Sequence, residues 1–258
     1  MSLTAGLRLA TGTLTVIPVG DIGAPDRRVG RAAMLLAPVA ALPLGLIAAA
    51  IVAAGRAIGL APFVTAGLTL GALALATRAM HLDALADTAD GIGAGWDRDR
   101  ALEVMHRGDV GPMGAAALVI TLLTQAGAIA ALAQAERGWL LVAAAVICSR
   151  TACALMCATI VPAARQSGMG AVMAASVPVG LVVLALGATT AALVIAALVA
   201  GVAWWVGLLA SAVAWLTVAL VTRTAIRVFG GVTGDVLGAG IEIAATILLI
   251  VYSTGAIA

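Results

Sequence analysis

The feature that most constrains this chain is a series of apolar runs long enough to cross a lipid bilayer. A membrane-spanning helix needs about 20 mostly apolar residues in succession, and the 258-residue sequence contains several such runs. Only 10% of its residues are charged, whereas about 25% is usual in soluble domains. Backbone groups in lipid must be paired within the segment, so these runs predict helices. We therefore expect an all-α, polytopic membrane bundle that forms a single domain over residues 1–258.

The boundaries of the runs predict about seven transmembrane helices. They cover residues 32–54, 60–77, 114–133, 139–161, two helices within 177–222 that turn near Gly201, and 235–252. Pro38 and Pro43 are expected to kink the first helix. Residues 1–20 predict an interfacial helix, and polar loops are expected at 78–113, 162–176 and 222–234.

The arginines predict an orientation, because basic residues accumulate on the cytoplasmic side of membrane proteins. With the N-terminus in the cytoplasm, eleven of the fourteen basic residues fall inside, and Arg56 and Arg137 fall outside. Arg150 lies within a span. This arrangement places all three polar loops, and any site they form, on the cytoplasmic face.

Several classes of function are disfavoured. The net charge of +2, with only two Phe and one Tyr, argues against nucleic-acid binding. Cys148, Cys153 and Cys157 lie within one apolar run and indicate small buried residues rather than a zinc site. The sequence shows no internal repeat of the kind found in many transporters. Whether the chain forms a homo-oligomer stays open.

Residues 81–91 carry the densest chemistry, with three carboxylates inside an apolar chain. Asp83, Asp87 and Asp90 are spaced i, i+4 and i+7, so on a helix they share one face. Like charges at this spacing repel unless a cation lies among them. Mg²⁺ prefers oxygen ligands and is often shared with substrate phosphates. We expect Mg²⁺ to be held by these three residues and Asp109, although a solvated helix face is the alternative.

A second motif occupies residues 230–239, where four glycines, a threonine and Asp235 precede the last span. Close helix packing explains glycines but not an ionisable residue at the membrane, which is a functional candidate. We expect Asp83, Asp87, Asp90 and Asp235 to be catalytic. The residues expected to bind substrate are His81, Thr88, Arg107, Arg165, Gly231, Thr233 and Gly234.

These motifs resemble those of the cobalamin synthase family, the adenosylcobinamide-GDP ribazoletransferases. Residues 81–91 match its HLDGLADTADG-type segment, with Ala84 in place of the usual glycine, and residues 230–239 match its GGVTGDxLGA motif. Arg98–Met105 approximates a helix that follows in the family. The chain departs from the family at residues 106–111, where the charges stand in a different order, so the resemblance supports Arg107 and Asp109 less well.

The resemblance implies a reaction, a cofactor and a location. Adenosylcobinamide-GDP would react with α-ribazole, or its 5′-phosphate, to give adenosylcobalamin, or its 5′-phosphate, and GMP. The ribazole 5′-hydroxyl is expected to attack the phosphorus on the cobinamide side of the diphosphate. The resemblance also implies Mg²⁺ dependence and a prokaryotic inner membrane.

Two rival functions remain. A CDP-alcohol phosphotransferase also displaces a nucleoside monophosphate, and residues 87–94 fit most of its first motif, but Gly95 stands where that motif has arginine. A cation-coupled transporter would place acids within several spans, whereas seven of the twelve acidic residues lie between positions 83 and 109.

Overall fold

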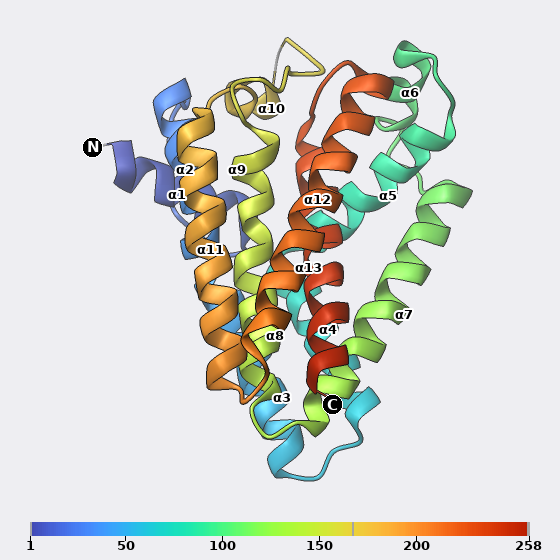
Figure 1. Cartoon of the computed structure of the whole chain (residues 1–258). Helices are drawn as coiled ribbons and strands as arrows, with labels where there is room; N and C mark the ends of the chain where they lie inside the picture. Colours follow the sequence, from blue (N-terminus) through green and yellow to red (C-terminus); the bar gives the residue numbers. More distant parts are fainter. Residues whose placement is uncertain (1, 167, 257–258) are drawn as a thin grey trace.

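The computed structural model describes residues 2–166 and 168–256, and these form a helical bundle (Figure 1). No strand occurs among them, and two isolated backbone bridges connect loops. The helices are α1 (Ser2–Leu14), α2 (Arg27–Ala40), α3 (Leu42–Ala57), α4 (Pro62–Ala76), α5 (Met80–Gly93), α6 (Arg98–Val104), α7 (Pro112–Gln134), α8 (Gly138–Cys148), α9 (Ala152–Met156), α10 (Met169–Met173), α11 (Val179–Val199), α12 (Trp204–Phe229) and α13 (Gly234–Ala256). A 3₁₀ turn, η1 (Ser149–Thr151), joins α8 to α9.

Six helical segments within the described residues are long and apolar enough to cross a membrane. They are Arg27–Ala57, Pro112–Gln134, Gly138–Met156, Val179–Val199, Trp204–Phe229 and Gly234–Gly255. Helices α4 and α5 pass the same test together, but they are bent by 89°. Counting this pair as one broken span gives seven, so the predicted fold class and number of spans are confirmed.

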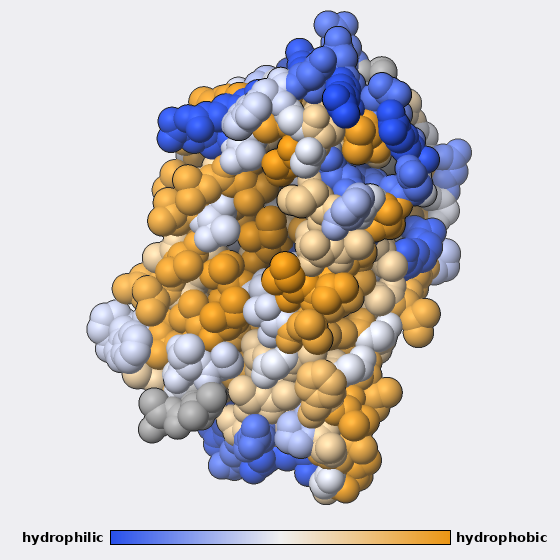
Figure 2. Space-filling model, turned by 90° about the vertical axis from the view of Figure 1, so that its right-hand side faces the viewer, coloured by the Kyte–Doolittle hydropathy of each residue, from blue (hydrophilic) through white to orange (hydrophobic). Residues whose placement is uncertain are grey.

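The outer faces of the bundle are apolar. Leu75 and Leu184 are more than two-thirds exposed, at 79% and 68%, and Figure 2 shows an apolar belt between more polar ends. Such a surface is unfavourable in water but suits a lipid environment. Helices α8, α9 and α13 are mostly buried, whereas α7 and α11 are mostly exposed. The core therefore surrounds α13.

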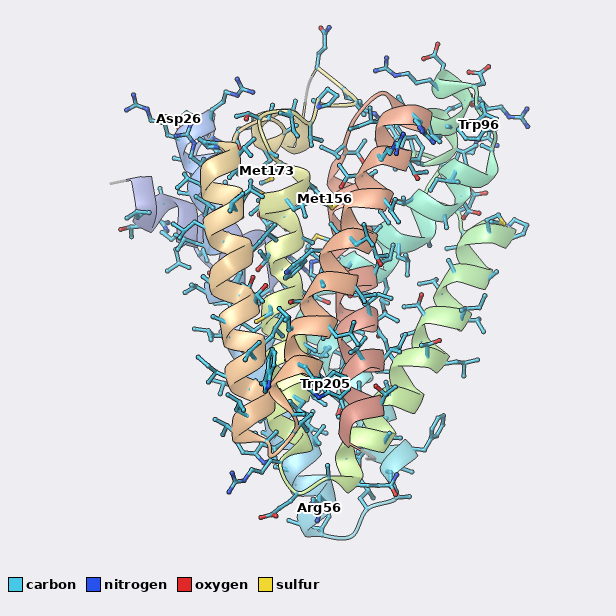
Figure 3. The ribbon with its side chains drawn as sticks, in the orientation of Figure 1. Asp26, Arg56, Trp96, Met156, Met173 and Trp205 are labelled. Atoms are coloured by element: carbon cyan, nitrogen blue, oxygen red, sulfur yellow. The ribbon has the colours of Figure 1, made fainter. Side chains whose placement is uncertain are left out.

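The first span is broken where its prolines predict. Helix α2 contains Pro38 near its end, α3 has Pro43 in its first turn, and Ala41 separates the two. Proline cannot donate to the carbonyl of the preceding turn, so the helix is interrupted there. The predicted N-terminal helix also forms, and α1 packs against α2. Labelled side chains in Figure 3 mark the two ends of the bundle, with Asp26 and Trp96 opposite Arg56 and Trp205.

Two polar segments expected to lie outside the bundle differ from that expectation, although the helix predicted from the spacing of Asp83, Asp87 and Asp90 does form. The segment 78–113 begins with α5, which packs against α7 and α13 instead of lying in solvent. Arg78 and Ala79 adopt left-handed backbone conformations, with φ of 55° and 54°, and these redirect the chain after α4. The expected loop 222–234 is shorter, because α12 continues to Phe229. Apolar faces explain both differences, since Leu85 in α5 and Val228 in α12 are buried.

Candidate functional site

A cavity lies between α5 and α13 and brings the two sequence motifs together. His81 and Asp83 come from α5, and Gly234, Asp235 and Gly238 come from α13, about 150 positions later. Apolar residues of α1, α2, α9 and α10 complete the wall, namely Leu14, Met34, Cys153 and Met173. The cavity is therefore apolar on one side and carboxylate-lined on the other.

Small residues allow α5 and α13 to approach closely. A Cβ atom on Gly238 would lie 2.5 Å from the Ala84 Cβ and 3.6 Å from the His81 Cα. Neither backbone can move away without opening the cavity, so this position requires glycine. The helix-packing explanation is thus correct for Gly238, while Asp235 faces the cavity and still needs a chemical role.

The N-terminus of α13 opens into the cavity. The Thr233 hydroxyl accepts a hydrogen bond from the Val236 N–H at 3.2 Å and donates one to Asp235 Oδ2 at 3.3 Å. The first N–H groups of a helix lack intrahelical partners, and the helix dipole favours anions there. Gly170 lies over this end, since its Cβ would be 3.1 Å from the Gly234 nitrogen. Gly234 and Thr233 therefore belong to a site suited to a phosphate group.

A neighbouring loop is fixed to the same motif by backbone pairing. The Ala164 N–H donates to the Val232 carbonyl, and the Val232 N–H donates to the Pro162 carbonyl, both at 3.0 Å. A Cβ on Gly231 would lie 2.4 Å from the Pro162 oxygen. The glycine at 231, predicted to bind substrate, thus permits close contact between two loops.

Four carboxylates of the two motifs lie near enough for their charges to interact. Asp83 is exposed to the cavity and Asp87 is half-buried. The charges of Asp83, Asp235 and Asp90 all act on the Asp87 carboxylate. The two ion pairs found among the described residues involve none of these four residues. Such a cluster of like charges is unfavourable unless a cation binds among them.

The donor set suits a metal that is shared with substrate. In residues 2–166 and 168–256, no three His, Cys, Asp or Glu side chains are close enough to hold an ion by themselves. Mg²⁺ usually needs only one or two carboxylates, with waters and substrate phosphates supplying the other oxygens. Asp83 and Asp235, which line the cavity beside the N-terminus of α13, fit that pattern.

Asp90 has a different environment from the one expected. Its two oxygens accept backbone N–H groups at the start of α7, from Gly111 at 2.7 Å and from Gly114 at 2.9 Å. A negative charge there stabilises the N-terminus of α7. A Cβ on Gly114 would lie 2.2 Å from Asp90 Oδ2, so the contact requires glycine. Asp90 is engaged in joining α5 to α7, and Asp109 is exposed in the segment before α7.

Three other predicted binding residues lie outside the cavity wall. Arg107 is exposed and pairs with Glu103 at 3.2 Å. Arg165 donates to the Leu102 carbonyl at 2.9 Å and also contacts His106 Nε2, which holds its loop against α6. Thr88 lines a separate apolar groove between α5, α7, α12 and α13. The structure therefore separates these side chains from Asp83 and Asp235.

The sequence did not predict the partners of His81. Its Nδ1 lies 4.0 Å from Glu242 Oε1, and Glu242 Oε2 accepts a hydrogen bond from the Gln125 amide at 3.0 Å. Glu242 and Arg150 are both charges within spans, and no ion pair joins them among the described residues. Arg150 instead donates to the Val146 carbonyl at 2.5 Å and to Ser149 Oγ at 3.0 Å.

Comparison with known proteins identifies the family. The model of the family described as cobalamin-5-phosphate synthase matches residues 6–253. The chain belongs to this family. The resemblance predicted from the two motifs is thus confirmed, and the cobalamin-5-phosphate synthase match extends over all six apolar spans.

Several curated relatives of this cobalamin-5-phosphate synthase family member come from bacteria and match it over nearly their whole length. One from Nocardioides sp., named adenosylcobinamide-GDP ribazoletransferase, is 44% identical over 247 residues, covering 95% of this chain and 97% of the relative. Proteins of the same name from Frankia casuarinae and Bradyrhizobium diazoefficiens are each 38% identical, covering 95% and 97% of this chain and 93% and 94% of their own lengths. No solved structure matches the chain.

Proposed function

We propose that the chain transfers the cobinamide phosphate of adenosylcobinamide-GDP to α-ribazole, or to its 5′-phosphate, with release of GMP. One observation carries this proposal. The two motifs, separated by about 150 positions, contribute Asp83 and Asp235 to a single cavity at the N-terminus of α13. A carboxylate pair beside unpaired backbone N–H groups suits the transfer of a phosphoryl group.

The reaction is a displacement at phosphorus. A ribose hydroxyl attacks the phosphorus on the cobinamide side, a new P–O bond forms, and the bond to the GMP phosphate breaks. The family description names a 5-phosphate product. With α-ribazole 5′-phosphate as the acceptor, the 5′ oxygen already carries phosphate and cannot attack, so another ribose hydroxyl would be the nucleophile.

The residues of the cavity position and neutralise the diphosphate. Backbone N–H groups at Gly234 and Asp235 would contact phosphate oxygens, while Thr233 holds this helix end in place. Asp83 and Asp235, which line the cavity with Asp87 beside them, would bind Mg²⁺ together with the substrate phosphates, and the ion supplies charge neutralisation when it is bound. The proton of the attacking hydroxyl would pass to a basic side chain that lines the cavity.

We place the protein in the cytoplasmic membrane with its N-terminus and cavity facing the cytoplasm. The loops at the cavity end carry most of the arginines, whereas Arg56 lies at the other end (Figure 3), where it donates to the Gln134 carbonyl close to Arg137. This orientation agrees with the bias of basic residues toward the cytoplasm. Water-soluble nucleotide substrates would then reach the cavity from the cytoplasm.

The direct test is an assay of the purified protein in liposomes. Adenosylcobinamide-GDP and α-ribazole, or its 5′-phosphate, are supplied with and without Mg²⁺, and GMP and the corrinoid product are measured. We expect both in equal amounts and only with the metal. Folded protein that forms neither product would reject the proposal. CDP-alcohol substrates and ion flux would then be assayed to test the two rival functions.

A further inference from the structure

His81 is buried beside the cavity, and its hydrogen-bonding capacity is unused. Its side chain is 4% exposed, and neither ring nitrogen has a hydrogen-bond partner among the described residues. Buried polar groups are nearly always paired, so an unpaired imidazole requires an explanation. His81 also lines the cavity that contains Asp83 and Asp235. A role toward the substrate would account for an unpaired nitrogen at this place.

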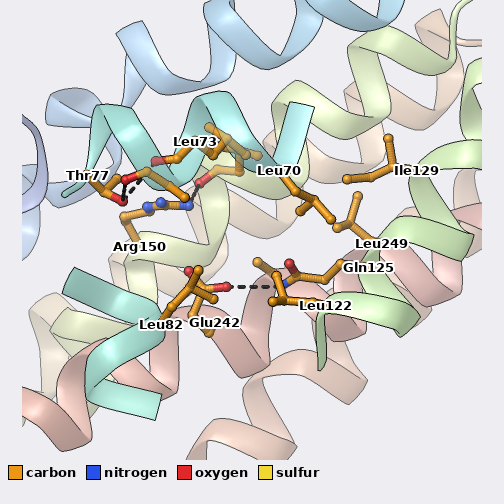
Figure 4. Close-up of a pocket in the computed structure, with 13 residues that line it drawn as sticks. Leu70, Leu73, Thr77, Leu82, Leu122, Gln125, Ile129, Arg150, Glu242 and Leu249 are labelled. Atoms are coloured by element: carbon orange, nitrogen blue, oxygen red, sulfur yellow. Dashed lines mark hydrogen bonds between the residues drawn. The ribbon is translucent and has the colours of Figure 1, made fainter. Parts of the chain in front are cut away.

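Glu242 on α13 is held in a fixed orientation next to His81. The Gln125 amide donates to Glu242 Oε2 at 3.0 Å and to the Thr246 hydroxyl oxygen at 2.9 Å. The Thr246 hydroxyl in turn donates to the Glu242 carbonyl at 2.7 Å. Figure 4 shows the contact between Gln125 and Glu242, with Arg150 at the same end of an adjoining cavity. This arrangement leaves Oε1 directed toward His81.

We propose that Glu242 is a positioning residue that orients His81 for the attacking hydroxyl, and this inference rests on the proposed function. The 4.0 Å separation between Nδ1 and Oε1 shortens to a hydrogen bond when substrate binds. Contacts of this kind are often long in unliganded enzymes and tighten in the complex.

The consequence for His81 is a defined tautomer. A neutral imidazole carries one N–H, and the hydrogen bond made by one nitrogen decides the state of the other. With Nδ1–H directed to Glu242, Nε2 becomes an acceptor at the cavity. The group that the reaction offers to such an acceptor is the ribose hydroxyl, so His81 would align it with the phosphorus.

The test uses the small number of histidines in the chain. His81 and His106 are the two present, so protein labelled with ¹⁵N-histidine gives two imidazole signals, and the variant His106→Gln assigns them. Spectra are recorded in liposomes with adenosylcobinamide-GDP bound, at a pH where both rings are neutral. We expect His81 to be protonated at Nδ1. Glu242→Leu should remove this preference, and Glu242→Gln, which keeps an acceptor oxygen, should restore it in part.

Kinetics separate positioning from a structural effect. Glu242→Leu should lower kcat roughly tenfold or more, because a misaligned nucleophile reacts slowly, while KM for adenosylcobinamide-GDP stays nearly constant. In a protein that already carries His81→Ala, Glu242→Leu should lower kcat no further, because both substitutions remove the same function. Glu136→Leu, at an exposed acid between α7 and α8, is the matched control.

The spectra and the product assay test different claims, so the positioning role and the proposed function can be rejected separately. An unchanged His81 tautomer in Glu242→Leu, or additive losses with His81→Ala, would overturn the positioning role. Because the spectra need no turnover, they report on the pair even if the wild-type protein forms no corrinoid product. Product formation, in contrast, tests the proposed function alone.

Discussion

At the scale of single residues, the four aspartates of the two motifs divide into two groups. Asp83 and Asp235 line the cavity, and the charges of both act on Asp87, whereas both oxygens of Asp90 bind the backbone at the start of α7. The i, i+4, i+7 spacing correctly predicts a helix that carries all three aspartates of the first motif. The spacing could not reveal that α7 begins beside the last of them, because this contact depends on how separate helices pack.

The role of Asp90 gives a first prediction. Asp90→Ala leaves two backbone N–H groups without their acceptor and should lower the free energy of unfolding by about 3 kcal/mol, since hydrogen bonds to charged groups are strong. Asp90→Asn keeps one acceptor oxygen and should lose less. Thermal unfolding in detergent, followed by circular dichroism, measures both. An Asp90→Ala protein of unchanged stability but no activity would instead assign Asp90 to the metal or substrate.

At the scale of helices, the bend between α4 and α5 positions the first motif. The apolar runs predict α4, but the 89° bend depends on Arg78 and Ala79 in left-handed conformations. Glycine usually occupies such positions, so a sequence without glycine there gives no local signal of the turn. Strained non-glycine residues of this kind are often found at functional sites.

The contact between α5 and α13 gives a second prediction. Gly238→Val should push the helices apart, because a Cβ there would already lie 2.5 Å from the Ala84 Cβ. We expect activity to fall roughly 100-fold as Asp83 and Asp235 separate, since small displacements at a reacting centre are costly. The control is Gly187→Ala in α11, where a Cβ meets nothing within 4 Å. Equal product formation by both variants would contradict the proposed contact.

At the scale of the whole molecule, hydropathy predicts the class of fold and six or seven spans. Hydropathy alone does not place the spans around α13, because the order of helices in a bundle depends on side-chain packing that periodicity does not encode. Gly201, with φ of 81°, marks the expected turn between α11 and α12. The predicted topology places both motifs on one face of the membrane, where they meet at one cavity. The position of Glu242 beside His81 was not predicted.

The orientation gives a third prediction, tested by cysteine labelling. Cys148, Cys153 and Cys157 are buried, so the native chain should react little with a membrane-impermeant maleimide. Asp99→Cys in α6 should be labelled only in inverted vesicles, and Glu136→Cys only in intact cells. Labelling with the opposite sidedness would place the cavity outside the cytoplasm.

The central claim is that Asp83 and Asp235 act in one site, and the most direct measurement is kcat/KM for both single variants and their combination. Asp83→Asn and Asp235→Asn should each lower product formation roughly 100-fold or more, because charge neutralisation at phosphorus is lost. The kcat/KM of the double variant should be only slightly below that of the less active single variant, because the effects of residues that act as a unit are not additive. Asp99→Asn, at an exposed carboxylate on α6, should keep wild-type activity. Full activity in either single variant, with the protein inserted and folded, would contradict the account.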